Sequence, residues 1–200
     1  MSVMALITTL LPQLTETERL EMQQSLGDVP LRRWAKGARL FSEQQSFAHL
    51  VLIQTGLIRS FYVDDDTEVN LRFLCDGSLA VPFAALAQAW VNGRHAPLMA
   101  TESLQCVTTV TGYVLPLSPL LDRTQWAHGE RLRTELAARH YVSMEQRLRM
   151  IQHQRAADRY ANFLCWMPAP IVAQMPNVQV ASYLGITPEA LSRIKAQAKR

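Results

Sequence analysis

The feature that most limits how this 200-residue chain can fold is a spacing near its C-terminus. Small Ala181 is followed four residues later by Gly185 and six residues beyond that by apolar Leu191. A small residue lets two helices approach closely, and a glycine permits the positive φ of a sharp turn. An apolar residue on the second helix then packs against the first. These are the requirements of a helix-turn-helix, so we predict two short helices joined by a tight turn within residues 177–200.

The expected ends of both helices follow from their flanking residues. Asn177 is a suitable N-cap for a first helix ending at Leu184, and Thr187 can cap the second. Pro188 suits the first turn of that second helix because its missing N–H has no helical partner there. The shared inward face is expected to contain Val180, Leu184, Ile186, Leu191 and Ile194.

Polar residues remain on the outward face at the start of the second helix, the end that enters the major groove in a recognition helix. Arg193 can bind a guanine edge, and Glu189 can accept from a cytosine amino group. Serine and lysine suit phosphate contacts. An ordinary helical hairpin with a solvated basic end is the alternative. The candidate DNA-binding residues are Thr187, Pro188, Glu189, Ser192, Arg193, Lys195 and Lys199.

Residues 180–194, VASYLGITPEALSRI, resemble the helix-turn-helix of the CRP/FNR regulators. The resemblance implies that Glu189 and Arg193 read bases. Many members carry an arginine just before that glutamate, where this chain has Pro188; the difference bears on the half-site sequence rather than on DNA binding. Residues 156–167 resemble the first helix of the same DNA-binding domain.

Charge is distributed unevenly along the chain. Residues 1–127 contain 9 basic and 12 acidic residues, whereas residues 128–200 contain 11 basic and 5 acidic. A basic C-terminal third is typical of a DNA-binding module attached to a sensor. No apolar run approaches the ~20 residues of a membrane span. The N-terminus lacks signal-peptide features. Cys75, Cys106 and Cys165 form no CxxC pair, so we expect reduced, buried cysteines and a cytoplasmic protein with no membrane partner.

The first two thirds of the sequence change from a helical to a β-rich pattern. Residues 3–26 are helical in pattern, with a capping box formed by Thr15 and Glu18. Alternating apolar and polar residues then predict half-buried strands, and many short strands with turn signals favour a barrel or jelly roll. The expected strands are 38–43, 49–54, 57–63, 68–75, 96–102 and 105–115.

Residues 49–77 are similar to the cyclic-nucleotide-binding-like barrel of the CRP/FNR family. The resemblance implies an α+β protein: an N-terminal double-stranded β-helix (jelly-roll) sensor domain over residues 1–126, a long dimerisation helix over 127–154, and a small all-α helix-turn-helix domain over 155–200. It also implies a site for a ligand phosphate, for which Arg94 and Ala96 have the spacing. No acidic residue lies between Asp76 and Arg94, so the ribose-binding glutamate is missing. We expect the barrel to bind another small ligand, or none; an exposed loop arginine is the alternative for Arg94.

We expect no cofactor, no metal and no enzymatic activity. The five histidines are dispersed, and a cupin-like enzyme would need them clustered with a carboxylate. Family members that hold an iron–sulfur cluster need four cysteines, and this chain has three.

A long helix is predicted over residues 127–154, with a heptad seam typical of a dimer interface. A helix packed on its own barrel is the alternative. The resemblance favours a homodimer, whose two-fold symmetry suits a palindromic operator. The seam residues are Thr134, Ala137, Tyr141, Met144, Leu148 and Ile151.

The helix predicted after residue 155 is expected to bury an apolar face of Ala157, Tyr160, Ala161, Leu164 and Cys165, extended by Trp166 and Met167. Because the sequence ends at Arg200, we expect no β-hairpin wing after the second helix. The leading interpretation is a homodimeric transcriptional regulator. A cyclic-nucleotide-responsive regulator and a protein-interaction module whose helix-turn-helix does not bind DNA are the alternatives.

Overall fold

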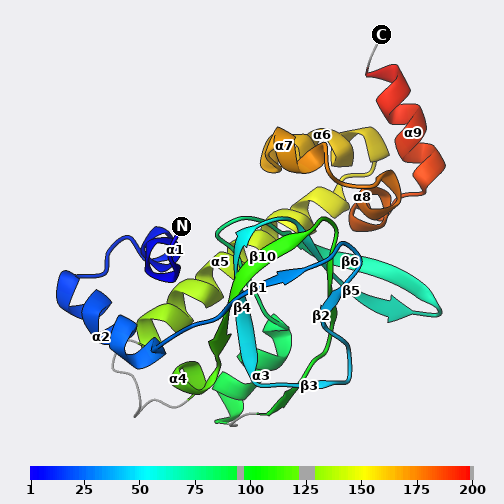
Figure 1. Cartoon of the computed structure of the whole chain (residues 1–200). Helices are drawn as coiled ribbons and strands as arrows, with labels where there is room; N and C mark the ends of the chain where they lie inside the picture. The colour runs from blue at the N-terminus through cyan, green and yellow to red at the C-terminus, as the bar shows by residue number, and fades with distance from the viewer. Residues whose placement is uncertain (94–96, 122–128, 199–200) are drawn as a thin grey trace. The chain divides into compact units, whose positions relative to one another are not determined.

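The computed structural model describes residues 1–93, 97–121 and 129–198 (Figure 1). These residues form two compact units: Met1–Ser60 with Phe73–Ala138, and Phe61–Arg72 with Arg139–Arg200. The functional division expected at 126/127 and 154/155 remains a prediction.

Antiparallel sheets arranged as a jelly roll make up most of the first unit, as predicted. Residues 61–72, which include parts of two of these strands, belong to the second unit. One four-stranded sheet has the order β1-β10-β4-β7, the other β2-β9-β5-β6, and a two-stranded sheet pairs β3 with β8. The short strands β1, β3 and β7 were not predicted. The bounds are β1 Leu31–Trp34, β2 Arg39–Phe41, β3 Ser46–Phe47, β4 His49–Thr55, β5 Ile58–Asp64, β6 Thr67–Leu74, β7 Leu79–Ala80, β8 Leu98–Met99, β9 Ser103–Cys106 and β10 Val110–Pro116.

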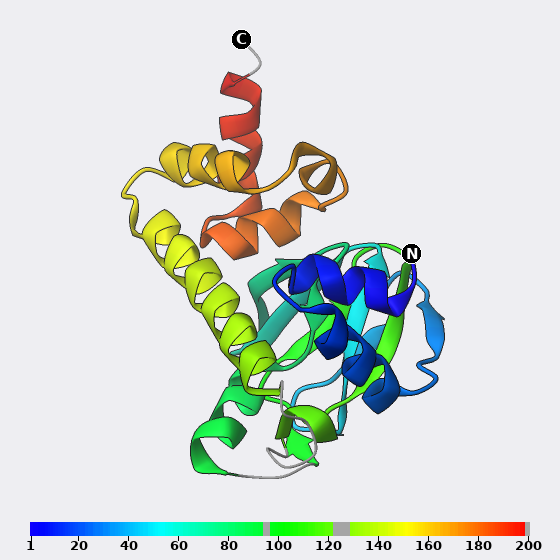
Figure 2. The same ribbon diagram turned by 90° about the vertical axis from the view of Figure 1, so that its left-hand side faces the viewer.

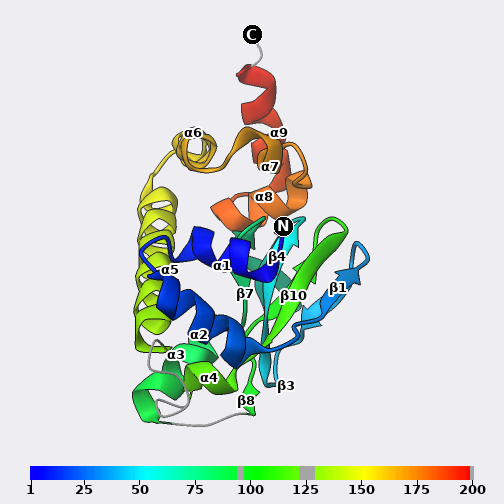
Figure 3. The same cartoon turned by 60° about the vertical axis from the view of Figure 1, so that its left-hand side comes forward.

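Strand β4 is buried on both faces, whereas the sequence suggested a half-buried strand. Leu50, Val51, Leu52 and Ile53 are all almost fully inaccessible. The reason is helix α1 (Val3–Leu10), which packs against β4 and contributes Leu6, Ile7 and Leu10 to the same core (Figure 3). A strand covered on both faces shows a continuous apolar run rather than alternation.

The N-terminal segment, predicted to be helical in pattern over residues 3–26, forms two helices, α1 and α2 (Glu16–Leu26). The predicted capping box is confirmed and explains where the second helix starts. The backbone N–H of Thr15 donates to Glu18 Oε2 at 2.7 Å, and the N–H of Glu18 donates to Thr15 Oγ1 at 3.3 Å. These bonds satisfy N–H groups that have no partner within the helix.

Two helices of the first unit were not predicted. The first is α3 (Phe83–Asn92), whose sequence FAALAQAWVN is rich in alanine, a strong helix former. Helix α4 (Ser118–Leu121) follows β10.

Helix α5 (Gly129–Gln152) is the predicted long helix and runs without interruption (Figure 2). It is followed by four shorter helices: α6 Ala156–Trp166, α7 Ala169–Val172, α8 Asn177–Leu184 and α9 Pro188–Gln197. None of the helices in the described residues is long and apolar enough to cross a membrane.

The buried face of α6 differs from the predicted one. Phe163 is fully buried and stacks near Tyr160, with ring centroids 6.3 Å apart, and Phe163 also contacts Tyr183 of α8 at 5.9 Å. Of the residues expected to face inward, only Tyr160 is buried. The others are exposed or half-buried: Ala157, Ala161, Leu164, Cys165, Trp166 and Met167. The expectation of buried cysteines is therefore wrong for Cys165, although Cys106 is buried and Cys75 half-buried.

Candidate nucleic-acid interface

The tight turn between α8 and α9 has the predicted geometry (Figure 2). Gly185 adopts φ 63° and ψ 41° and ends α8, and its N–H donates to the carbonyl oxygens of Ala181 and Ser182. A residue with a Cβ is strained in this left-handed region. Ala181 and Leu191 are both fully buried, so the two helices pack closely at the positions that the spacing indicated. The remaining inward residues are Val180 and Leu184, fully buried, and Ile186 and Ile194, half-buried.

The start of α8 lies one residue earlier than predicted. Pro176 is the N-cap, and Asn177 is the first helical residue. The Asn177 side chain does not cap α8, because its Oδ1 accepts a hydrogen bond from Lys195 Nζ at 2.6 Å. The Lys195 ammonium also lies 5.6 Å from the centroid of the Tyr160 ring. Lys195, expected to contact phosphate, thus links α9 to the start of α8.

Helix α9 begins as the sequence predicts. Thr187 Oγ1 accepts from the N–H of Ala190 at 3.2 Å, and Pro188 occupies the first helical position. The pKa of the exposed Glu189 is lowered by a hydrogen bond to its own backbone N–H, by the Thr187 hydroxyl, and by the charge of Arg193. Glu189 is therefore ionised at neutral pH and can act as a hydrogen-bond acceptor.

Arg159 of α6 fixes the position of the turn. Its Nη1 donates to the carbonyl oxygens of Leu184 and Gly185, both at 3.2 Å, and its Nε donates to the carbonyl oxygen of His153 at 2.7 Å. A cation at the C-terminal end of α8 also interacts favourably with the helix dipole. The local sequence around Arg159 carries no signal of this role, because its partners lie 25 and 26 residues away.

The outward face of α9 carries three exposed polar side chains close to the start of the helix: Glu189, Ser192 and Arg193. All three were predicted. The guanidinium of Arg193 is suited to donate hydrogen bonds to a guanine edge, and the carboxylate of Glu189 is suited to accept one from a cytosine amino group. Thr187 and Pro188 are exposed at the start of the helix, and Lys199 lies outside the described residues.

The same face continues to the last residue of α9. Gln197 is exposed and lies four residues, about one turn, after Arg193, so the two side chains are neighbours on the helix surface. Glutamine can bind an adenine edge or a phosphate. Gln197 was not among the predicted DNA-binding residues.

Residues 61–72 contact α8 within the second unit, an arrangement that local patterns do not reveal. The side-chain amide of Asn70 donates to Gln179 Oε1 at 2.6 Å and to the Gln179 carbonyl oxygen at 3.0 Å. Ser182 Oγ accepts from the N–H of Asn70 and donates to the carbonyl oxygen of Glu68. Arg147 of α5 donates to the Asn70 carbonyl oxygen at 2.9 Å. This polar network holds α8 from the side opposite its apolar face.

The predicted seam of α5 is largely open. The exposed fractions of Tyr141 and Leu148 are 67% and 52%. Thr134 and Ala137 are exposed, and Met144 and Ile151 are half-buried. Two large apolar side chains on one helix are thus accessible to solvent. Such exposure is expected of a dimerisation seam when the partner helix is absent.

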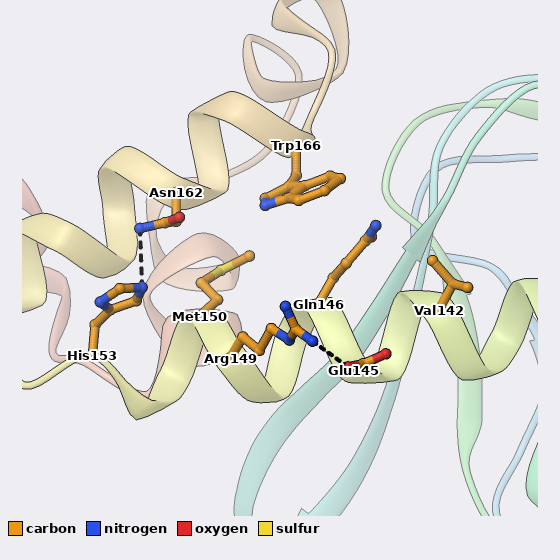
Figure 4. A pocket seen from close by; sticks show the side chains of 8 residues that line it. All are labelled: Val142, Glu145, Gln146, Arg149, Met150, His153, Asn162 and Trp166. Atoms are coloured by element: carbon orange, nitrogen blue, oxygen red, sulfur yellow. Dashed lines mark hydrogen bonds and ion pairs between the residues drawn. The ribbon is translucent and has the colours of Figure 1, made fainter.

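A pocket of about 390 Å³ lies between α5 and α6 within the second unit (Figure 4). Trp166 of α6 lies across from Met150 and Gln146 of α5. At its edges, Arg149 pairs with Glu145 at 2.6 Å, and Asn162 Nδ2 lies 3.2 Å from His153 Nε2. The full lining is Val142, Glu145, Gln146, Arg149, Met150, His153, Asn162 and Trp166.

Several solved protein structures are similar to this chain over most of its length. FixK2 from Bradyrhizobium japonicum superposes with a TM-score of 0.70 and 17% identity, over 86% of this chain and 84% of that one. A protein from Eubacterium rectale assigned to the CRP/FNR family gives a TM-score of 0.67 and 15% identity, over 95% and 86%. The chain has the CRP/FNR fold. The c-di-GMP-responsive regulator CLP from Xanthomonas campestris has the same fold, with a TM-score of 0.63 and 14% identity, over 90% and 91%.

At 14–17% identity, the similarity to these structures is one of fold. No family model matches the chain, and no curated protein matches it. The two residues expected to bind a ligand phosphate, Arg94 and Ala96, lie outside the described residues. Within the described residues, no group of three or more His, Cys, Asp or Glu side chains is placed to hold a metal ion.

Proposed function

We propose that this protein is a cytoplasmic, homodimeric transcriptional regulator that binds a palindromic DNA operator through α9. The observation that carries the proposal is the outward face of α9. Glu189, Ser192 and Arg193 are exposed together on a helix whose opposite side is anchored by buried Leu191. Their side chains supply the donors and acceptors with which base edges are read in the major groove.

The residues around this face support DNA binding in two further ways. Thr187 and Ser192 are exposed hydroxyl side chains suited to phosphate contacts. The Asn177–Lys195 hydrogen bond joins α9 to α8, and Arg159 joins α6 to the turn between them, before DNA binds. Fixing α9 in advance reduces the ordering that binding would otherwise require.

Dimerisation through α5 completes the proposal. Two copies joined along Ala137, Tyr141, Met144, Leu148 and Ile151 would bury the exposed apolar seam and present two recognition helices. Such helices bind half-sites about 34 Å apart. A small effector that changes transcription would have to bind the two arrangements of these helices with different affinities.

Selection of bound sequences from random duplex DNA at about 150 mM salt tests the proposal. We expect the wild-type protein to enrich a palindrome, and the Glu189→Ala, Arg193→Ala double variant to enrich none. A Glu21→Ala, Arg32→Ala double variant is the matched control, because it removes the same charges from exposed positions of the first unit. Equal, weak, salt-dependent binding by all three proteins would contradict base readout by α9. It would instead favour a protein-interaction role for the helix-turn-helix.

A further inference from the structure

A buried carboxylate lies inside the first unit, between β8 and β9. Glu102 is only 3% exposed, so its charge cannot be solvated by water and must be satisfied by the protein. Its Oε2 accepts from the hydroxyl of Ser60, which is fully buried on β5. Its Oε1 accepts from the backbone N–H of Phe83 at 2.9 Å.

The bond to Phe83 is placed at the first residue of α3. The first N–H groups of a helix have no partner within the helix, and together with the helix dipole they attract an anion. The N-cap of α3 is Pro82, which makes no side-chain capping bond, and the first turn of α3 contains no acidic residue. Glu102, nineteen residues away in sequence, performs the capping that α3 lacks locally.

Arg59, the residue before Ser60 on β5, is a second buried charged side chain that is bonded within the protein. Arg59 is 5% exposed, and its Nε and Nη2 both donate to Gln105 Oε1, at 3.0 and 2.7 Å. Gln105 in turn donates from Nε2 to the carbonyl oxygen of Gly37 at 3.0 Å. Arg59 and Glu102, buried around β5 and β9, are therefore both bonded to protein groups.

We propose that Glu102 is a built-in anionic ligand of the barrel, occupying the anion position at the N-terminus of α3. The internal carboxylate keeps α3 capped without any bound phosphate or carboxylate from solution. As a consequence, an anionic small molecule does not stabilise the wild-type barrel through this position. This capping is independent of DNA binding, because it lies entirely within the barrel.

Chemical rescue tests the proposal. Glu102→Ala deletes a carboxymethyl group, whose shape and charge acetate restores. We expect Glu102→Ala to lower Tm by about 4 °C or more, because buried partners of a charged group lose their bonds. Acetate at about 100 mM should recover at least half of that loss relative to chloride at the same ionic strength. The wild-type protein and the exposed control Glu21→Ala should show no such response.

A second variant keeps the test decisive if Glu102→Ala does not fold. Glu102→Gln preserves the side-chain shape but removes the charge, and we expect the amide of Phe83 to exchange with solvent about 10-fold faster as its cap weakens. Unchanged exchange at Phe83 in Glu102→Gln would overturn the proposal. So would wild-type Tm in Glu102→Ala, or equal stabilisation of variant and wild type by acetate.

Discussion

At the scale of single residues, the backbone conformation of Gly185 determines whether α8 and α9 can meet. Its φ of 63° lies in the left-handed region, and a Cβ there would lie 3.6 Å from Arg159 Nη1, an ordinary contact. Space is therefore available, and the cost of a side chain comes from the backbone alone. We expect Gly185→Ala to lower the free energy of unfolding by about 1–2 kcal/mol.

Denaturant unfolding checks this expectation, with Gly185→Asn as the comparison. Asparagine tolerates the left-handed conformation better than alanine, so its loss of stability should be the smaller of the two. Equal losses would indicate that contacts, rather than φ, set the requirement for glycine.

The three cysteines differ in a way that thiol chemistry can measure. Burial raises the pKa of Cys106 to about 11, and burial is also the main cause of the raised pKa of Cys75. Cys165 is exposed on α6. Because the thiolate is the reactive form, at pH 8 Cys165 should react with a disulfide reagent on the order of 100-fold faster than Cys106. Cys165→Ser should remove the fast phase, and a fast phase that persists in this variant would contradict the assignment.

At the scale of secondary-structure elements, the spacing of residues predicted the structure correctly where residues close together in the chain determine it. The capping box of Thr15 and Glu18 and the turn at Gly185 depend on residues within a few positions of one another. The face of α6 was predicted wrongly for the opposite reason. Its sequence, AADRYANFLCW, offers apolar residues on more than one side. The packing of Phe163 against Tyr183, twenty residues later, decides which side is buried.

Other contacts between residues far apart in the chain could not be predicted either. Arg159 acts through carbonyl groups 25 and 26 residues away, and Asn70 binds Gln179 across 109 residues. Such contacts leave no periodic signal in one sequence. Gln197, by contrast, could have been identified from its position one turn after Arg193.

The exposed apolar seam of α5 predicts which substitutions weaken dimerisation. We expect Leu148→Glu, alone or with Tyr141→Glu, to weaken dimerisation by at least about 100-fold, because a charge would be buried between the two helices without a partner. Ser143→Glu is the control, since Ser143 is exposed and lies off the seam. Sedimentation equilibrium measures the outcome. A wild-type monomer, or a Leu148→Glu dimer of unchanged affinity, would contradict dimerisation through this helix.

At the scale of the whole molecule, the sequence divides into a mildly acidic part and a basic C-terminal third. This asymmetry predicts that affinity for any duplex falls as salt rises, because phosphate contacts release counterions. Salt dependence alone does not establish a regulator, since nonspecific binding shows it too. The discriminating quantity is the ratio of affinities for the selected operator and for random duplex.

The central claim, that α9 reads bases, is tested most directly by measuring this ratio for wild type and Arg193→Ala at one salt concentration. We predict that Arg193→Ala loses about 1–3 kcal/mol of binding free energy on the operator and much less on random duplex, so that specificity falls. Arg32→Ala, the exposed control on β1, should leave the ratio unchanged. An equal loss on both DNAs would show that Arg193 contacts only phosphate, and no loss on either would show that α9 does not enter the groove.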